Sequence, residues 1–158
     1  MITPTAAIEA ARQGLSQLQL ADQPDIHVAI SGGNPGEPRY VARLDQADQG
    51  YYLVPWQQAQ GITAIVLIDA QTGSFSSLAT PSTPQQALVI SRKELGRYIT
   101  AQSSLRVTAE PKLVWQPCRE TASPFLPLYR VPTDSGPIFV GMNGVLHQQL
   151  TPLMQGGG

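Results

Sequence analysis

The chain has 158 residues, of which 42% are hydrophobic and 13% carry a charged side chain. The ten basic and eleven acidic residues nearly cancel, so no overall field attracts nucleic acid or an anionic membrane surface. This balance argues against nucleic-acid binding as the main activity, and the apolar fraction argues against a disordered chain. The length suits one ordinary domain or two small ones.

A single cysteine, Cys118, restricts the chemistry of the chain. It cannot form an intramolecular disulfide, and it cannot supply the several thiolates of a structural zinc site. The first residues lack the basic and apolar regions of a signal peptide, and no apolar run reaches membrane-spanning length. We expect no membrane insertion and a cytoplasmic location for the chain as given, or an extracytoplasmic one if a signal peptide was removed.

The first half of the chain begins with a predicted helix. Thr3 is a suitable N-cap, Pro4 suits the first helical position, and apolar residues then recur at spacings of three and four up to Leu18. Two strands are expected at 26–30 and 39–44, with a loop rich in Gly and Pro at 31–38 between them.

The apolar run at 62–68 is the centre of the first half. Its β-branched residues predict a core strand, and Asp69 and Gly73 predict a tight turn after it. Further strands are expected at 51–56 and 74–78. Because the run is apolar on both faces, a second unit or another chain must cover the face that the helix leaves open.

The second half repeats this order of elements. Ser91 and Glu94 form a capping box that predicts a helix at 91–102, and Asn143 with Gly144 predicts a two-residue hairpin turn. The strands expected in this half lie at 105–107, 112–116, 125–131, 137–142 and 145–150.

A short motif occurs once in each half, as Tyr52-Leu-Val-Pro55 and Tyr129-Arg-Val-Pro132. Matching spacing of unlike elements favours an internal duplication. The predicted fold is therefore an α+β protein made of two helix-plus-antiparallel-meander units packed together. The expected parts are a first unit at 1–80, a linker at 81–90, a second unit at 91–152 and a flexible tail at 153–158.

The apolar strand followed by Asp69, Thr72 and Gly73 resembles the strand and Asp-x-x-Thr-Gly turn of PepSY-like domains, within the wider cystatin-like class. The second half keeps only Gly144, with Asn143 before it. The resemblance implies two tandem copies of a helix packed on a curled antiparallel sheet. It also implies a non-enzymatic role in binding or restraining a partner protein, with peptidases among the candidates. Separately, pairing with a second copy as a homodimer is the other partner that we expect.

The expected contact elements are the exposed loop and the aromatic strand of the first half. Loops that join strands often carry binding residues, which selects Asn34. Aromatic residues contribute disproportionately to interfaces, which selects Tyr51, Tyr52 and Trp56. The alternative is that these aromatic side chains fill the core.

A second alternative is a small enzyme that uses Cys118, with His27 or His147 as base. Pro117 before the cysteine indicates a rigid turn rather than a helix N-terminus that would stabilise a thiolate. The two histidines lie far apart in sequence without paired carboxylates. We therefore expect no catalytic residue, no metal site and no cofactor.

The C-terminal Gly157 and Gly158 suggest a third possibility, a modifier-like protein that is processed or conjugated through its terminus. An unbranched backbone at this position can thread the narrow channel of a processing enzyme. The chain starts with a predicted helix, unlike the β-grasp order of such modifiers, so a plain tail is the simpler interpretation.

Overall fold

The computed structural model describes residues 1–18 and 22–153. It divides into two units, each described separately below: unit 1 comprises residues 1–40 and 49–88, and unit 2 comprises residues 41–48 and 89–158. Within the described ranges, the α+β composition that the sequence predicts is confirmed, and no helix is long and apolar enough to cross a membrane.

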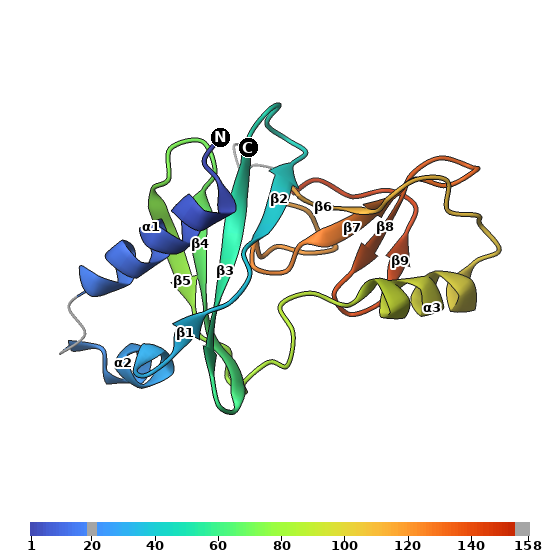
Figure 1. Ribbon diagram of the computed structural model, residues 1–158. Coiled ribbons are helices and arrows are strands. Elements are labelled where there is room, and N and C mark those ends of the chain that lie inside the picture. The colour runs from blue at the N-terminus through green and yellow to red at the C-terminus, as the bar shows by residue number, and fades with distance from the viewer. Residues whose placement is uncertain (19–21, 154–158) are drawn as a thin grey trace. The chain divides into compact units, whose positions relative to one another are not determined.

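Figure 1 labels the helices and strands. The elements of the first part are α1 (Pro4–Ser16), α2 (Pro24–Ile30), β1 (Asn34–Pro35), β2 (Arg39–Arg43), β3 (Gly50–Gln58), β4 (Gly61–Asp69) and β5 (Phe75–Ala79). Those of the second part are α3 (Arg92–Gln102), β6 (Lys112–Trp115), β7 (Leu128–Val131), β8 (Ile138–Gly141) and β9 (Leu146–His147).

The strands belong to one mixed nine-stranded sheet with the order β5-β4-β3-β2-β6-β7-β8-β9, and β1 pairs with β3. β2 and β6 run parallel, with Ala42 opposite Val114 and Arg43 opposite Trp115. The predicted fold of two packed helix-plus-antiparallel-meander units is therefore wrong. Alternating hydrophobicity marks where strands lie but not which edges pair, and a parallel pairing between distant segments leaves no local signal.

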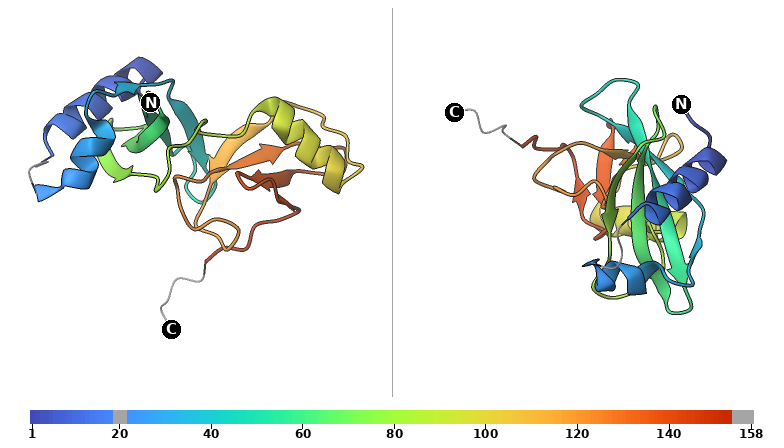
Figure 2. Two further views of the ribbon diagram at one scale, coloured as in Figure 1. Left: turned by 90° about the horizontal axis from the view of Figure 1, so that it is seen from below. Right: turned by 90° about the vertical axis from the view of Figure 1, so that its left-hand side faces the viewer.

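α1 confirms the predicted N-terminal helix. The Thr3 hydroxyl accepts a hydrogen bond from the N–H of Ala6 at 3.1 Å, and Pro4 occupies the first turn. The helix buries Ala7, Ala11 and Leu15 against β3, β4 and β5. Figure 2 shows α1 lying across this part of the sheet. Unit 1 thus has a helix-on-sheet core in which the apolar face of α1 packs on apolar residues of the strands.

The strand predicted at 26–30 is instead the short helix α2. Pro24 occupies the first turn and Asp25 follows it, which favours a helix start. The last carbonyl groups of a helix lack partners within it. Here Gln58 donates to Val28 O at 2.9 Å, Trp56 donates to Ile30 O at 3.0 Å, and Thr63 donates to Ala29 O. These hydrogen bonds from the sheet favour a helix here, although the β-branched residues of this segment favour a strand.

The hairpin of β3 and β4 confirms the predicted core strand. Tyr52 lies opposite Ile68 and Val54 opposite Val66 in an antiparallel register. The turn after β4 also forms as expected, since Asp69 Oδ1 accepts hydrogen bonds from the backbone of the next residues and Gly73 has a φ of 77°. A positive φ at this position favours glycine.

Unit 2 contains the second predicted helix and a hairpin at the predicted place, but not the predicted two-residue turn, since the Gly141 N–H donates to Val145 O across a three-residue loop. The Ser91 hydroxyl accepts a hydrogen bond from the Glu94 N–H at 3.1 Å, and α3 follows directly. β6, β7, β8 and β9 pair antiparallel in sequence order. Asn143 Oδ1 accepts from the Val145 N–H at 3.1 Å in the turn between β8 and β9. The segment 105–107 forms no strand, and only Val107 makes a single bridge, to Thr133.

Candidate functional site

The aromatic residues expected to contact a partner are buried in unit 1. Tyr51, Tyr52 and Trp56 are 4%, 3% and 7% exposed. The Tyr52 hydroxyl donates to Ile2 O at 3.0 Å, and the Trp56 indole N–H donates to a carbonyl of α2. Tyr52 and Trp56 belong to the core of unit 1 beneath α1, whereas Tyr51 points to the other face of β3 and is equally buried, so all three present little surface to a partner.

Asn34 is exposed, but its loop is held against the sheet. Asn34 lies opposite Gln57 and Pro35 opposite Trp56, so two loop residues form β1. The Gly36 N–H donates to Pro55 O at 2.8 Å. The loop predicted at 31–38 is therefore partly an ordered strand pairing. The other two predicted positions, Gly157 and Gly158, lie outside the described residues.

Cys118 lies in the core of unit 2 and is fully buried. Its Sγ hydrogen-bonds to Thr121 O at 3.4 Å. Burial raises the pKa of the thiol, and the nearby Glu120 carboxylate raises it further. A nucleophilic cysteine needs a stabilised thiolate and access to substrate, and this thiol has neither. Residues 1–18 and 22–153 also contain no cluster of three or more His, Cys, Asp or Glu that could hold a metal.

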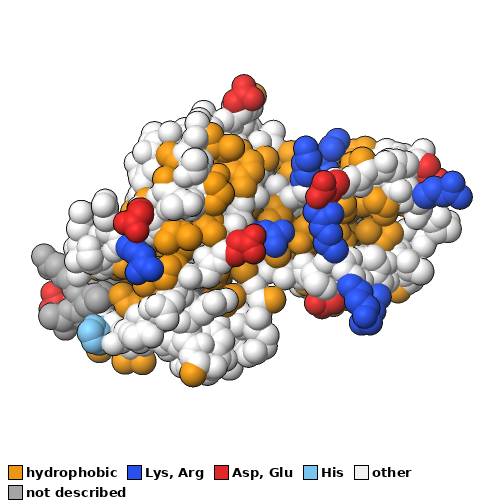
Figure 3. Space-filling model, viewed as in Figure 1, with side chains coloured by type: hydrophobic (Ala, Val, Ile, Leu, Met, Phe, Trp, Pro, Cys, Tyr) orange, Lys and Arg blue, Asp and Glu red, His pale blue; other side chains and the backbone are white. Residues whose placement is uncertain are grey.

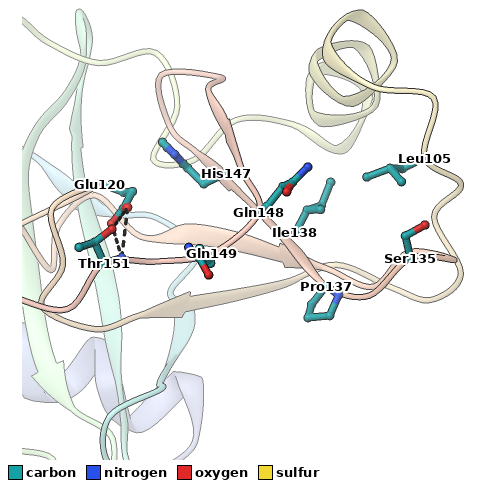
Figure 4. A pocket seen from close by; sticks show the side chains of 9 residues that line it. All are labelled: Leu105, Glu120, Ser135, Pro137, Ile138, His147, Gln148, Gln149 and Thr151. Carbon is teal, nitrogen blue, oxygen red and sulfur yellow. Dashed lines mark hydrogen bonds between the residues drawn. The ribbon is translucent and has the colours of Figure 1, made fainter.

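Unit 2 carries an open polar groove of about 660 Å³, shown in Figure 4. Its acidic group is Glu120, whose oxygens accept hydrogen bonds from the Thr151 N–H at 2.9 Å and the Thr151 hydroxyl at 2.8 Å. Burial raises the pKa of this carboxyl, but the Thr151 bonds outweigh it and the net shift is downward. Glu120 thus anchors the segment after β9 and is poorly suited to proton transfer near neutral pH.

The outer edge of β5 is one end of the sheet and belongs to unit 1. β5 ends the strand order, and no other strand of the described part pairs with its outer side. An open edge presents N–H and C=O groups that can pair with another chain. Natural sheets usually protect such an edge with charges, prolines or covering segments.

The hydrogen bonds around β4 determine which groups of β5 point outward. Asp69 donates to Ser74 O at 2.9 Å, toward β5, and Ala70 donates to Gly50 O at 3.1 Å, toward β3. Successive residues of a strand direct their backbone groups to opposite sides. Val66 therefore directs its groups to β3, as Ala70 does. Leu78 lies opposite Val66, so its own N–H and C=O point to the outer edge.

No residue from 70 to 91 is charged, so neither β5 nor its flanks carry a protecting charge. The edge of β9, the last strand of unit 2, is instead covered by a side chain. Gln102 of α3 donates to Gly144 O at 2.6 Å and accepts from the Leu146 N–H at 3.0 Å, which covers the edge of β9. β5 is the longer strand, and within residues 1–18 and 22–153 no helix side chain caps its edge in this way.

The sequence interpretation missed this edge, because no feature of the sequence distinguishes it from the other strands. The stretch at 70–91 is uncharged, but the stretches at 49–68 and 135–158 also lack Lys, Arg, Asp and Glu, so the absence of charge does not distinguish β5. Edge position itself depends on the strand order, which is a tertiary property. Comparison of the chain with protein-family models, curated proteins and solved structures gave no match, so the resemblance to PepSY-like domains stays a prediction.

Proposed function

We propose that the protein is a non-enzymatic protein-binding module that pairs an extended, uncharged segment of a partner with the outer edge of β5. The observation that carries the proposal is the uncharged edge of β5, with the backbone groups of Leu78 directed outward. Strand addition to an open sheet edge is a recurrent mode of peptide recognition, in which main-chain hydrogen bonds supply affinity.

The side chains of β5 favour a partner with apolar residues at alternate positions. Phe75 packs on Gly14 of α1, and both Phe75 and Leu78 are half-buried against the core of unit 1. An added strand would place every second side chain beside these two residues, on the face that α1 covers. A charged side chain there would lose water without gaining an opposite charge from β5 or its flanks, since 70–91 has none.

Selection of short linear peptides from a displayed random library against the full chain tests this function. We expect enriched peptides that are poor in charge and alternate apolar residues. Binding should slow hydrogen exchange of the Leu78 N–H by about tenfold or more, because that amide gains a partner. Enrichment of no peptide, or binding that leaves the exchange of Leu78 unchanged, contradicts the proposal.

A matched pair of variants isolates the backbone group. Leu78→Ala removes the side chain and keeps the N–H, whereas Leu78→Pro removes the outward N–H as well. We expect the selected peptides to bind Leu78→Ala and to lose binding to Leu78→Pro, with circular dichroism confirming that both variants fold. Equal binding by both variants would place the peptide elsewhere. If Leu78→Pro does not fold, the exchange measurement on the unmodified chain decides.

A further inference from the structure

A second hollow, independent of the β5 edge, lies between α1, α2 and β3 of unit 1. Its volume is about 320 Å³, near the lower limit for small-molecule pockets. The residues that line it are Arg12, Leu15, Ser16, His27, Ile30, Ser31 and Trp56.

The apolar lining is fixed in place before any ligand arrives. Leu15 is 4% exposed, and Trp56 is held by its indole hydrogen bond to Ile30 O at 3.0 Å. A side chain at Gly33 would collide with the indole ring, 2.6 Å from Cδ1, so the loop also packs on Trp56. Because its N–H already has a partner, the indole offers apolar ring surface rather than a polar group.

The polar lining favours a negative charge. Arg12 and His27 contribute nitrogen donors, Ser16 and Ser31 contribute hydroxyl groups, and no acidic residue of the described part lines the hollow. Arg12 Nε lies 3.9 Å from Glu9 Oε1, beyond hydrogen-bond distance, and both side chains are more than half exposed. Such an exposed pair is weak, so the guanidinium is able to reorient toward a ligand.

We infer that this hollow binds a small amphiphilic carboxylate, with its apolar body against Ile30 and the small exposed part of Trp56, and its carboxylate at Arg12. Figure 3 shows hydrophobic side chains beside α1 with a basic side chain at their border. The volume limits the ligand to roughly a bicyclic ring or a short acyl chain. A guanidinium pairs with a carboxylate through two parallel hydrogen bonds, which fixes the orientation of the ligand.

Titration of the full chain with 1-naphthylacetate, followed by nitrogen–proton NMR spectra, tests the inference. The chain has two tryptophans, so the Trp115 indole signal is an internal control for the Trp56 signal. We expect saturable shifts of the Trp56 indole and of the amides of Leu15 and Ile30, with the Trp115 indole unchanged. Neutral 1-naphthylacetamide should bind about threefold more weakly, the effect of one exposed ion pair.

Two variants test the assignment of the charge. Arg12→Gln should remove the difference between acid and amide, whereas Arg97→Gln, which changes an exposed arginine of α3, should preserve it. The inference is overturned if the Trp56 signal shows no saturable shift. It is equally overturned if the acid and the amide bind alike, or if Arg12→Gln keeps the preference. None of these outcomes affects peptide binding at β5.

Discussion

The hydroxyl of Tyr129 in β7 donates a hydrogen bond to the carbonyl oxygen of Ile90 at 2.9 Å, and Ile90 directly precedes the N-cap of α3. In unit 1 the Tyr52 hydroxyl donates to Ile2 O at 3.0 Å, and Ile2 directly precedes the N-cap of α1. Each tyrosine opens a Tyr-x-Val-Pro motif. The repeated motif thus corresponds to a repeated hydrogen bond that joins a strand to a distant helix start.

Replacing Tyr129 with phenylalanine tests the value of this bond. The Tyr129 side chain is fully buried, so the variant removes the hydroxyl and leaves Ile90 O without that donor. We expect the free energy of unfolding to fall by about 1 to 2 kcal/mol, measured by urea denaturation. Tyr52→Phe should also lower the free energy of unfolding. A variant as stable as the unmodified chain would mean that the bond contributes nothing net.

Glycine at position 14 is required by close packing, in spite of its helical location. A Cβ at Gly14 would lie 2.1 Å from Cδ2 of the Phe75 ring, which is too close to accommodate without movement. Gly→Ala in a helix interior normally stabilises by up to about 1 kcal/mol. Overpacking typically costs about 1 to 3 kcal/mol, so we expect Gly14→Ala to be net destabilising in thermal or urea unfolding.

Gly96 provides the matched control for this prediction. It lies in α3, and no atom comes within 4 Å of a Cβ built on it. Gly96→Ala should therefore stabilise the chain by up to about 1 kcal/mol. Adding Phe75→Leu to Gly14→Ala should recover part of the lost stability. A stabilising Gly14→Ala would indicate that Phe75 moves aside at little cost.

The sequence predicts most elements of this protein because their signals are local. Thr3 and Ser91 mark helix starts through side chains that cap the backbone, and both caps form. The prediction is wrong for α2, where the sequence predicts a strand. Its last turn is stabilised by hydrogen bonds from side chains of the sheet, namely Gln58, Thr63 and Trp56. A contact from a distant strand overrides the local pattern and cannot be read from residues 26–30 alone.

The candidate sites also depend partly on local sequence signals and partly on contacts between distant segments. Aromatic residues at 51, 52 and 56 predict either a core or an interface, and only tertiary packing decides: all three are buried, and Tyr52 and Trp56 pack in the cluster that includes α1. The edge of β5 and the hollow at Trp56 depend on strand order and helix placement, neither of which the sequence pattern specifies. The uncharged stretch at 70–91 fits an open edge but does not identify it, because 49–68 and 135–158 also lack Lys, Arg, Asp and Glu.

The burial of Cys118 predicts a thiol that reacts only when the protein opens. Burial raises its pKa, so the reactive thiolate is scarce at neutral pH, and no surface of the side chain is exposed. At about pH 8, we expect the rate of labelling by a disulfide reagent to be limited by the rate at which the fold opens. In denaturant the labelling should become rapid. Fast labelling of the folded chain would contradict this prediction and would support the hypothesis of a Cys-dependent enzyme.

The turn after β4 predicts that the protein loses part of its stability at acidic pH. Hydrogen bonds from the Thr72 backbone lower the pKa of the Asp69 carboxyl, with further bonds from the Gln71 N–H and the Thr72 hydroxyl, against an opposing effect of burial. Because the folded-state pKa lies below the unfolded one, the stabilisation is present above the unfolded pKa. It is lost as the pH falls through the folded pKa.

Asp69→Asn separates the charge from the turn geometry, since the amide oxygen can still accept the bonds that Asp69 Oδ1 accepts from the Gln71 and Thr72 N–H groups. The difference in unfolding free energy between the two proteins should be constant near neutral pH and should shrink as the pH falls below about 4. Carboxyl carbon NMR should give Asp69 a lower midpoint in the folded chain than in a peptide spanning 66–76. An equal or higher midpoint would mean that the backbone donors of this turn do not stabilise the carboxylate.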